Sequence, residues 1–362
     1  MTKVSWLTRL LHFGGGNPQA DPDGMHGSTL LSAPEAATGY CNAADRPTLP
    51  TRSPAELLFL SRFIKARRPD SLEGFYDWPA VLHRSVRSTI ERLLEEGSLR
   101  PATSHEQLDL DLKVTDLKEI LRQKGLPVSG LKKTLLKRIS DEEADAIVQS
   151  TNRPAAYHLS GFLRPLVDEF LAHQRETQTQ AEAASLAYLK QKQLLEACRL
   201  VAAHESTQVF PRDIGRSSQD PRGSRDYAFL STIFSKVPGI LSNVPPDTLP
   251  WVRLGAGMMV LWGENRVDRW TPSDLVTGCK FDLNTAARMY VFYCQQRDQI
   301  AQLAEIGARR VQILRTDDDT SCRACASLAK RRYGLNSIPE VPSPSCSSEL
   351  GCRCVILVDT GR

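Results

Sequence analysis

The chain has 362 residues, 41% of them hydrophobic, which is enough for two or three domains with apolar cores. Lys plus Arg (46) barely exceed Asp plus Glu (42), so the net charge of +4 alone indicates neither a nucleic-acid nor a membrane partner. The longest apolar stretch, Leu254 to Trp262, is far shorter than the roughly 20 residues that span a bilayer, and we expect no membrane partner.

The N-terminal region predicts a flexible leader over residues 1–52. Lys3 to Phe13 is typical of a short amphipathic helix and has no secretion cleavage site. Gly14 to Pro54 is rich in Gly, Pro and Ala and shows no hydrophobic period. Without an export signal we expect a cytoplasmic protein, whose nine cysteines are thiols or metal ligands rather than disulfides.

The next region predicts a helical, winged-helix-like domain over residues 53–108. Ser53 and Pro54 are typical of a helix cap and a first helical residue, and apolar residues then follow at helical spacing. A second helix is predicted from Trp78 to Glu96, ended by Gly97.

Helical spacing returns after residue 146 and predicts a mainly α, multi-domain protein. A helical segment (146–210) carries one helix over Leu159 to Leu171 and a long one from Ala181 to about His204. A Gly-, Pro- and Ser-rich linker (211–226) precedes a helical domain (227–312). The remaining elements are a helix from Leu283 to about Gly307, strands at Arg310–Leu314 and Val355–Val358, and a Cys-rich tail over 313–362, which together form an α+β C-terminal domain.

A basic two-helix pattern lies between these helical regions, with the sequence LKVTDLKEILRQKGLPVSGLKKTLLKRI. Thr115 is predicted to cap the first helix, and Gly125 to end it in a left-handed conformation. Ser129 is predicted to cap the second helix. Its buried face is predicted to comprise Leu131, Leu135, Leu136 and Ile139.

Charge in this pattern is one-sided, because only Asp116 and Glu119 oppose the basic residues. The basic residues are Lys113, Lys118, Arg122, Lys124, Lys132, Lys133, Lys137 and Arg138. Free amides at the start of the second helix, beside Lys132 and Lys133, are suited to a phosphate group.

From Leu112 to Ile139 the pattern resembles the SAP family of DNA-binding modules, and we assign residues 109–145 to a SAP helix-turn-helix. The resemblance implies binding of double-stranded DNA through phosphates and groove shape. Leu131 departs from the family, whose members often have a polar residue there. The implied DNA-binding residues are Lys113, Lys118, Arg122, Ser129, Gly130, Lys132, Lys133, Lys137 and Arg138. An ordinary solvated basic face, RNA binding and protein contact remain alternatives.

Five cysteines gather in the tail, and their spacing predicts a structural zinc site. A CxxC pair is followed by a lone cysteine and a CxC pair, and no histidine follows His204. Five candidates for four positions leave one spare, and reduced, unliganded thiols are the alternative. The candidate ligands are Cys322, Cys325, Cys346, Cys352 and Cys354.

The tail also resembles the C-terminal end of phage head-morphogenesis (Mu F-like minor head) proteins. The resemblance rests on a strand, an Asp-x-x-x-Cys-x-x-Cys pattern, a Pro-rich loop and Gly-Cys-Arg-Cys before a last strand. Leu328-Ala329-Lys330 stands where that family usually has Leu-Asp-Gly. The resemblance implies an assembly role with protein partners at the tail.

No common nucleotide-binding or catalytic motif occurs in the chain, which favours a non-enzymatic protein. Three functions stay open: a DNA-binding protein with a zinc-containing tail, a phage-derived assembly protein, and a DNA-processing enzyme with an unrecognised site in 227–314. Glu264, Asp268, Asp274 and Asp282 are the acidic residues available to such an enzyme, but their spacing favours a solvated face. Trp251, Trp262 and Trp270 are predicted core residues, and Cys198, Cys279 and Cys294 are predicted buried thiols.

Overall fold

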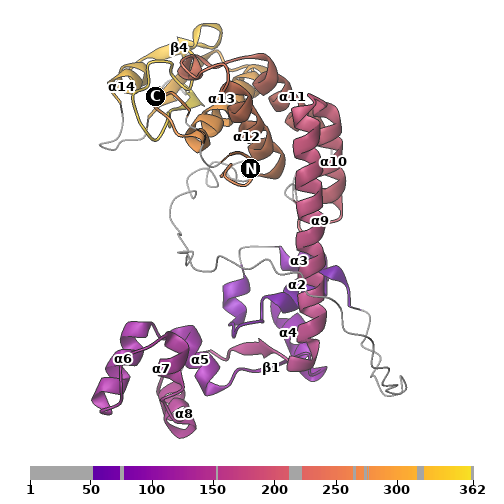
Figure 1. Cartoon of the computed structure of the whole chain (residues 1–362), viewed down its shortest axis with the longest axis vertical. Coiled ribbons are helices and arrows are strands. Elements are labelled where there is room, and N and C mark those ends of the chain that lie inside the picture. The colour runs from indigo at the N-terminus through magenta and orange to yellow at the C-terminus, as the bar shows by residue number, and fades with distance from the viewer. Residues whose placement is uncertain are drawn as a thin grey trace, which may run out of the picture. The chain divides into compact units, whose positions relative to one another are not determined.

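The computed structural model describes residues 52–73, 77–151, 154–211, 222–263, 266–272, 275, 277–315 and 322–359. Their structure is mainly helical with two small antiparallel sheets, which confirms the predicted class (Figure 1). The predicted leader up to residue 51 and the linker residues 212–221 lie outside the described residues. No helix in the described part of the chain is both long and apolar enough to cross a membrane.

Helix α2 (Pro54–Ser61) begins where the sequence predicts it. The Ser53 side chain accepts a hydrogen bond from the Glu56 amide at 3.2 Å. Pro54 is the first helical residue, where a backbone amide would have no partner within the helix. A 3-10 turn, η1 (Pro69–Leu72), follows.

The single helix predicted from Trp78 to Glu96 is wrong, because two helices, α3 (Trp78–Leu82) and α4 (Val86–Glu95), occupy this stretch. His83 has a φ of 54° and ends α3 in the left-handed region. The Ser85 side chain then accepts a hydrogen bond from the Ser88 amide at 3.1 Å and caps α4. Apolar spacing continues across the break, so only the serine cap signals it.

Strand β1 (Leu99–Pro101) pairs antiparallel with β2 (Tyr157–Leu159), with Leu99 opposite Leu159. Residues 104–150 lie between these strands in the chain, so the unit that they form is an insertion into a two-stranded ribbon. The residues on both sides of the insertion share one core. That core comprises Leu57, Phe59, Leu60, Phe63, Leu72, Trp78, Val86, Ile90, Leu93, Leu99, Leu159, Leu163 and Val167.

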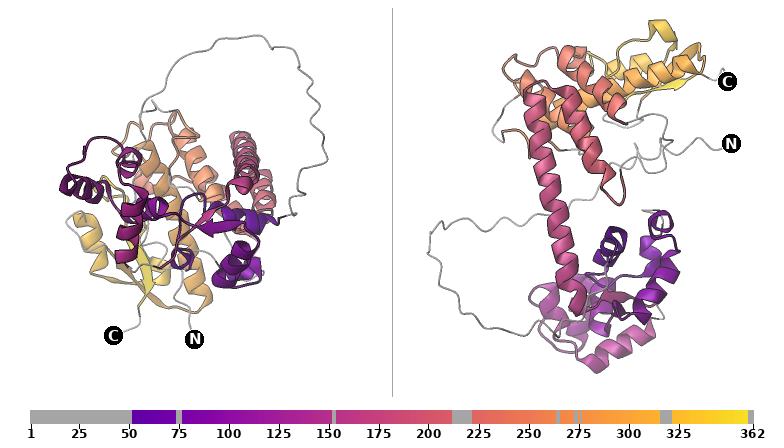
Figure 2. Two further views of the ribbon diagram at one scale, coloured as in Figure 1. Left: turned by 90° about the horizontal axis from the view of Figure 1, so that it is seen from below. Right: turned by 90° about the vertical axis from the view of Figure 1, so that its right-hand side faces the viewer.

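The two helices predicted over Leu159–Leu171 and Ala181–His204 have different bounds in the structure. After the turn η2 (Gly161–Leu163), α9 (Arg164–Lys190) runs without interruption, and α10 (Leu194–Ser206) folds back beside it (Figure 2). No Gly or Pro follows Pro165 within α9, so nothing in the backbone breaks it. The break comes at Lys192, whose φ is 59°.

The inserted unit contains four helices: α5 (Ser104–Asp111), α6 (Val114–Gln123), α7 (Lys132–Leu136) and α8 (Asp141–Ser150). They enclose a separate small core of leucine, isoleucine and alanine side chains. Its buried members are Leu108, Leu117, Leu121, Leu135, Leu136, Ile139 and Ala144. The unit therefore has a hydrophobic core of its own, which includes α5 and α8 beyond the predicted pair of helices.

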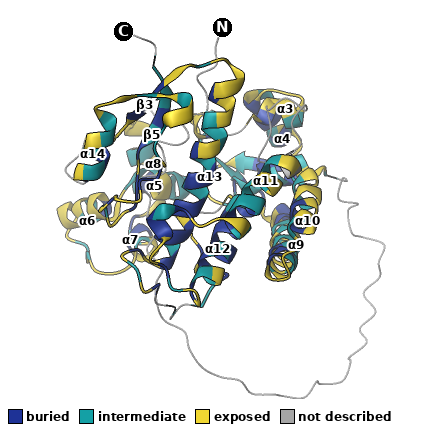
Figure 3. Ribbon diagram, turned by 90° about the horizontal axis from the view of Figure 1, so that it is seen from above, coloured by how far each residue is buried: buried dark blue, intermediate teal, exposed yellow. Residues whose placement is uncertain are grey.

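The C-terminal part is built on α12 (Leu249–Trp262) and α13 (Leu283–Glu305), whose buried faces are seen in Figure 3. Helix α11 (Arg222–Ser235) and the turn η3 (Gly239–Leu241) precede them. Asp282 caps α13 by accepting a hydrogen bond from the Thr285 amide at 2.6 Å. Trp262 and Trp270 are buried and Trp251 packs against the same core, as predicted.

The C-terminal sheet has strand order β4-β3-β5. The strands β3 (Arg310–Leu314) and β5 (Val355–Val358) have the predicted bounds and pair antiparallel. The sequence analysis missed β4 (Arg332–Gly334), which pairs with the other edge of β3. Helix α14 (Arg323–Ala329) and the turn η4 (Leu335–Ser337) complete this part.

Candidate nucleic-acid interface and metal centre

The first helix of the basic pattern, α6, is capped differently from the prediction. Thr115 lies inside the first turn, and the Asp116 side chain accepts the Lys113 amide hydrogen at 2.9 Å. Gly125 has a φ of 67° and ends the helix as predicted, while the Leu126 amide donates to the Leu121 carbonyl at 2.9 Å.

The second helix, α7, begins two residues later than predicted. Its N-cap is Leu131, whose side chain makes no capping hydrogen bond, so the prediction that Ser129 caps it is wrong. Leu131 is 81% exposed and was wrongly assigned to the buried face. Because the cap residue stands before the first turn, only Leu135, Leu136 and then Ile139 face the core.

The side chains of three of the predicted DNA-binding residues have partners within the fold. Lys132 forms an ion pair with Asp109 at 3.1 Å and also donates to the Asp109 carbonyl. Arg138 donates to the carbonyls of Pro127 and Ser129 at 2.6 and 2.7 Å. Arg122 is paired with Glu119.

Two of these three contacts hold the module's connections in place. Lys132 joins the start of α7 to the end of α5, and Arg138 fixes the loop between α6 and α7. The Lys124 ammonium likewise pairs with Glu143 of α8. The sequence analysis missed Asp109 as the partner of Lys132. The only signal for this ion pair was the position of Asp109 on the helix before the basic pattern.

Four lysines of the pattern make no ion pair with any residue in the described ranges. They are Lys113, Lys118, Lys133 and Lys137, of which all but the half-buried Lys118 are exposed. Their side chains keep free ammonium groups, which is the requirement for contacting phosphates. Lys133 and Lys137 are four residues apart and therefore project from the same side of α7.

Acidic residues gather at the opposite end of the module's sequence, in the first turn of α8. Asp141, Glu142 and Glu143 occupy this turn, and Ser140 and Glu143 form a capping box. Positive and negative charges of the inserted unit are therefore in different parts of its sequence. The lysines without ion pairs belong to α6, α7 and their caps, and the acidic residues belong to the first turn of α8.

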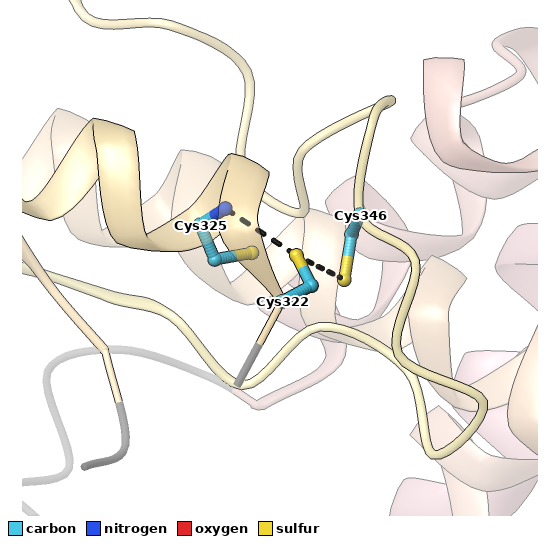
Figure 4. A group of neighbouring side chains, drawn as sticks. All are labelled: Cys322, Cys325 and Cys346. Atoms are coloured by element: carbon cyan, nitrogen blue, oxygen red, sulfur yellow. Dashed lines mark hydrogen bonds between the residues drawn. The ribbon is translucent and has the colours of Figure 1, made fainter. Parts of the chain in front are cut away.

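The tail cysteines form one buried cluster. Cys322 caps α14, and its sulfur accepts a hydrogen bond from the Cys325 amide at 3.3 Å (Figure 4). The sulfurs of Cys322 and Cys346 are 3.7 Å apart. Cys322 is 9% exposed and Cys346 1%, so this side of the cluster is closed to solvent.

A second triad overlaps the first. Cys325, Cys352 and Cys354 have sulfurs within 4.8 Å of one another, as have Cys322, Cys325 and Cys346. The sulfurs of Cys325 and Cys352 are 3.8 Å apart. Cys325 is the member common to both triads and thus lies at the centre of the cluster.

Local hydrogen bonds favour the thiolate at Cys322 and Cys352, whereas the pKa values of Cys325, Cys346 and Cys354 are raised. Burial opposes ionisation of Cys322, but backbone hydrogen bonds from Cys325 and Ser347 outweigh it and lower the pKa of this thiol to about 7. Thiol donors on Cys325, Cys346 and Cys354 lower the pKa of Cys352. By contrast, burial raises the pKa of Cys294 to about 12, as in an inert core thiol.

Two sulfur–sulfur separations in the cluster suit the ligands of a tetrahedral metal ion. Zinc–sulfur bonds of about 2.3 Å place the corners of a tetrahedron about 3.8 Å apart. The Cys322–Cys346 and Cys325–Cys352 separations, 3.7 and 3.8 Å, match that edge. The cluster can therefore hold a metal ion, as the cysteine spacing predicts. Asp317, Asp318 and Asp319, whose carboxylates are close to Cys322 in the sequence, lie outside the described residues.

Two of the four acidic residues considered for an enzyme lie in the described ranges, and each has a local partner. Asp282 caps α13, and Asp268 pairs with Arg266 on the surface. Glu264 and Asp274 lie outside the described residues.

Comparison with known proteins identifies the inserted unit. Residues 111–142 match the family model of the SAP domain, so the chain contains a SAP-type module, which indicates DNA binding. The match covers α6, α7 and the beginning of α8. No curated protein and no solved structure matches the chain. The resemblance of the tail to phage head-morphogenesis proteins is not confirmed.

Proposed function

We propose that this protein binds double-stranded DNA through its SAP module. The observation that carries the proposal is a set of four lysines, on α6, α7 and their caps, that make no ion pair with any described residue and lie within the residues that match the SAP family. Lys113, Lys118, Lys133 and Lys137 bind phosphates, while Lys132 and Arg138 hold the helices that present them. Contacts of this kind position a duplex without reading its sequence.

The test is the salt dependence of binding to a short duplex, measured by fluorescence anisotropy. Wild type is compared with Lys133→Gln/Lys137→Gln, and the matched control removes two exposed lysines elsewhere, Lys65→Gln/Lys330→Gln. Each lost phosphate contact lowers the slope of log K against log salt by about 0.9, so the first double variant should lose about 2 in slope. An equal loss in the control, or no binding by wild type, contradicts the proposal.

We further propose that the tail holds one structural zinc ion, with four of the five cysteines as ligands. Bound zinc would join α14 to the loop before β5 and make the small sheet rigid, without an open position for catalysis. Elemental analysis of the purified protein should give close to one zinc per chain. A metal-free preparation, isolated without chelator, contradicts this proposal.

A further inference from the structure

Leu131 has a surface position that folding does not explain. At 81% exposure it is the most exposed of the large hydrophobic side chains in the described ranges. Helix N-caps favour Ser, Thr, Asp, Asn or Gly, which accept an amide hydrogen or adopt the cap conformation easily. Leu131 provides no capping bond and buries little apolar surface, so its side chain contributes to neither the helix nor the core.

The backbone around Leu131 is held firmly. Gly130 before it has a φ of 116°, a conformation that few other residues adopt. The two hydrogen bonds from Arg138 fix the carbonyls of Pro127 and Ser129, and the contacts of Lys132 with Asp109 fix the residue after it. A projecting side chain on a fixed backbone loses little entropy when it binds.

Lysines and further exposed apolar side chains are close to Leu131. Some are near it in the sequence, and others are brought near by the ion pair between Lys132 and Asp109. Lys133 lies two residues beyond Leu131, and Lys113 is the N-cap of α6, four residues after Asp109. Leu110 and Val114 are 41% and 38% exposed at the same junction of α5 and α6. An apolar residue beside free lysines is complementary to a DNA groove, where phosphates border apolar sugar and base edges.

We propose that Leu131 enters a groove of the duplex and packs against sugars and base edges, while Lys113 and Lys133 bind the bordering phosphates. This inference rests on the proposed DNA binding and adds a contact that salt does not screen. It assigns to the module an apolar contribution to affinity, separate from that of the lysines.

The experiment measures duplex affinity across salt for Leu131→Ser, Leu131→Met and Lys133→Gln. Leu131→Ser should bind about tenfold more weakly at every salt concentration, with an unchanged slope, because an apolar contact releases no counterions. Leu131→Met should stay within about twofold of wild type. Lys133→Gln should flatten the slope instead. Leu195→Ser, an equal change on α10 at 42% exposure, is the control and should bind like wild type.

The outcomes separate the two proposals. If Leu131→Ser binds like wild type while Lys133→Gln flattens the slope, the groove contact is overturned and DNA binding stands. If wild type binds no duplex at any salt concentration, the proposed function fails as well. Thermal melting verifies that Leu131→Ser is folded, which its exposed position leads us to expect.

Discussion

Leu131 and Leu135 are four residues apart and have opposite surroundings. Leu135 is completely buried in the core of the SAP module, and Leu131 is 81% exposed. The same amino acid therefore serves the core at one position and is available to a partner at the other. Substitutions at these two sites can separate stability from binding.

We expect Leu135→Ala to lower the free energy of unfolding of the module by about 2–5 kcal/mol, because it leaves a cavity in a small core. Leu131→Ala should change it by less than about 0.5 kcal/mol. Urea denaturation of both full-length variants measures the difference. Similar destabilisation by both substitutions would show that Leu131 is buried in solution.

The central place of Cys325 leads to a second prediction at this scale. Cys325→Ser should abolish zinc binding, since Cys325 belongs to both triads. Cys322→Ser and Cys346→Ser should each lower zinc content less than Cys325→Ser does, because each of these two residues belongs to only one of the triads.

The measurement is zinc content after dialysis, together with competition against a colorimetric chelator. The double variant Cys322→Ser/Cys346→Ser should lose zinc, and Cys294→Ser is the control outside the cluster. Full zinc content in Cys325→Ser would refute the assignment of a shared central ligand.

At the scale of elements, the joint between the β1–β2 ribbon and α5 depends on Glu106. Its carboxylate accepts hydrogen bonds from the Arg100 guanidinium at 2.6 and 2.7 Å and from the Thr103 amide at 2.8 Å. The Thr103 hydroxyl accepts the Glu106 amide in return, which completes a capping box. One carboxylate thus caps α5 and fastens it to β1.

This joint should weaken in acid. Burial raises the pKa of Glu106, but the bonds from Arg100 and Thr103 outweigh it and hold the pKa below its ordinary value of 4.5. The folded state therefore favours the ionised carboxyl. Its contribution is complete above the unfolded pKa and is lost as the pH falls through the lower, folded pKa.

Urea denaturation between about pH 6 and about pH 3 measures this contribution. The free energy of unfolding should fall less steeply with acid in Glu106→Gln, which keeps the shape of the side chain but not its titration. Identical pH profiles for Glu106→Gln and wild type would show that this carboxyl does not sense pH.

At the scale of the whole molecule, the described residues form separate hydrophobic cores. The SAP core shares no buried residue with the core that contains the cysteine cluster. Helix α9 contributes Val167 to the N-terminal core and Leu189 to the C-terminal one. Separate cores allow the zinc site and the DNA-binding surface to act independently.

Removal of zinc should therefore destabilise the tail and leave DNA affinity unchanged. We expect a zinc chelator to lower the melting temperature of the C-terminal part, because metal binding contributes directly to its folding. Duplex affinity, measured by anisotropy on the same sample, should stay within about twofold. A parallel loss of DNA affinity would place part of the DNA-binding surface on the tail.

Local patterns in the sequence were sufficient to predict several elements. The start of α2 at Pro54, the strands Arg310–Leu314 and Val355–Val358, and the gathering of the tail cysteines all agree with the structure. Each depends on residues close together in the chain or on a short spacing motif. The SAP pattern is of the same kind, because its turn and apolar positions are contiguous.

Only the tertiary structure decided the features that depend on contacts between residues distant in the sequence. Whether a lysine is free depended on Asp109 and Glu143, which lie on helices outside the basic pair. The overlap of the two cysteine triads depended on the chain returning to α14 after the Pro-rich loop. Amino-acid type and spacing alone thus determined which chemical groups the SAP module and the tail contain. Packing decided which of those groups remain available, because burial and pairing arise only when distant segments meet.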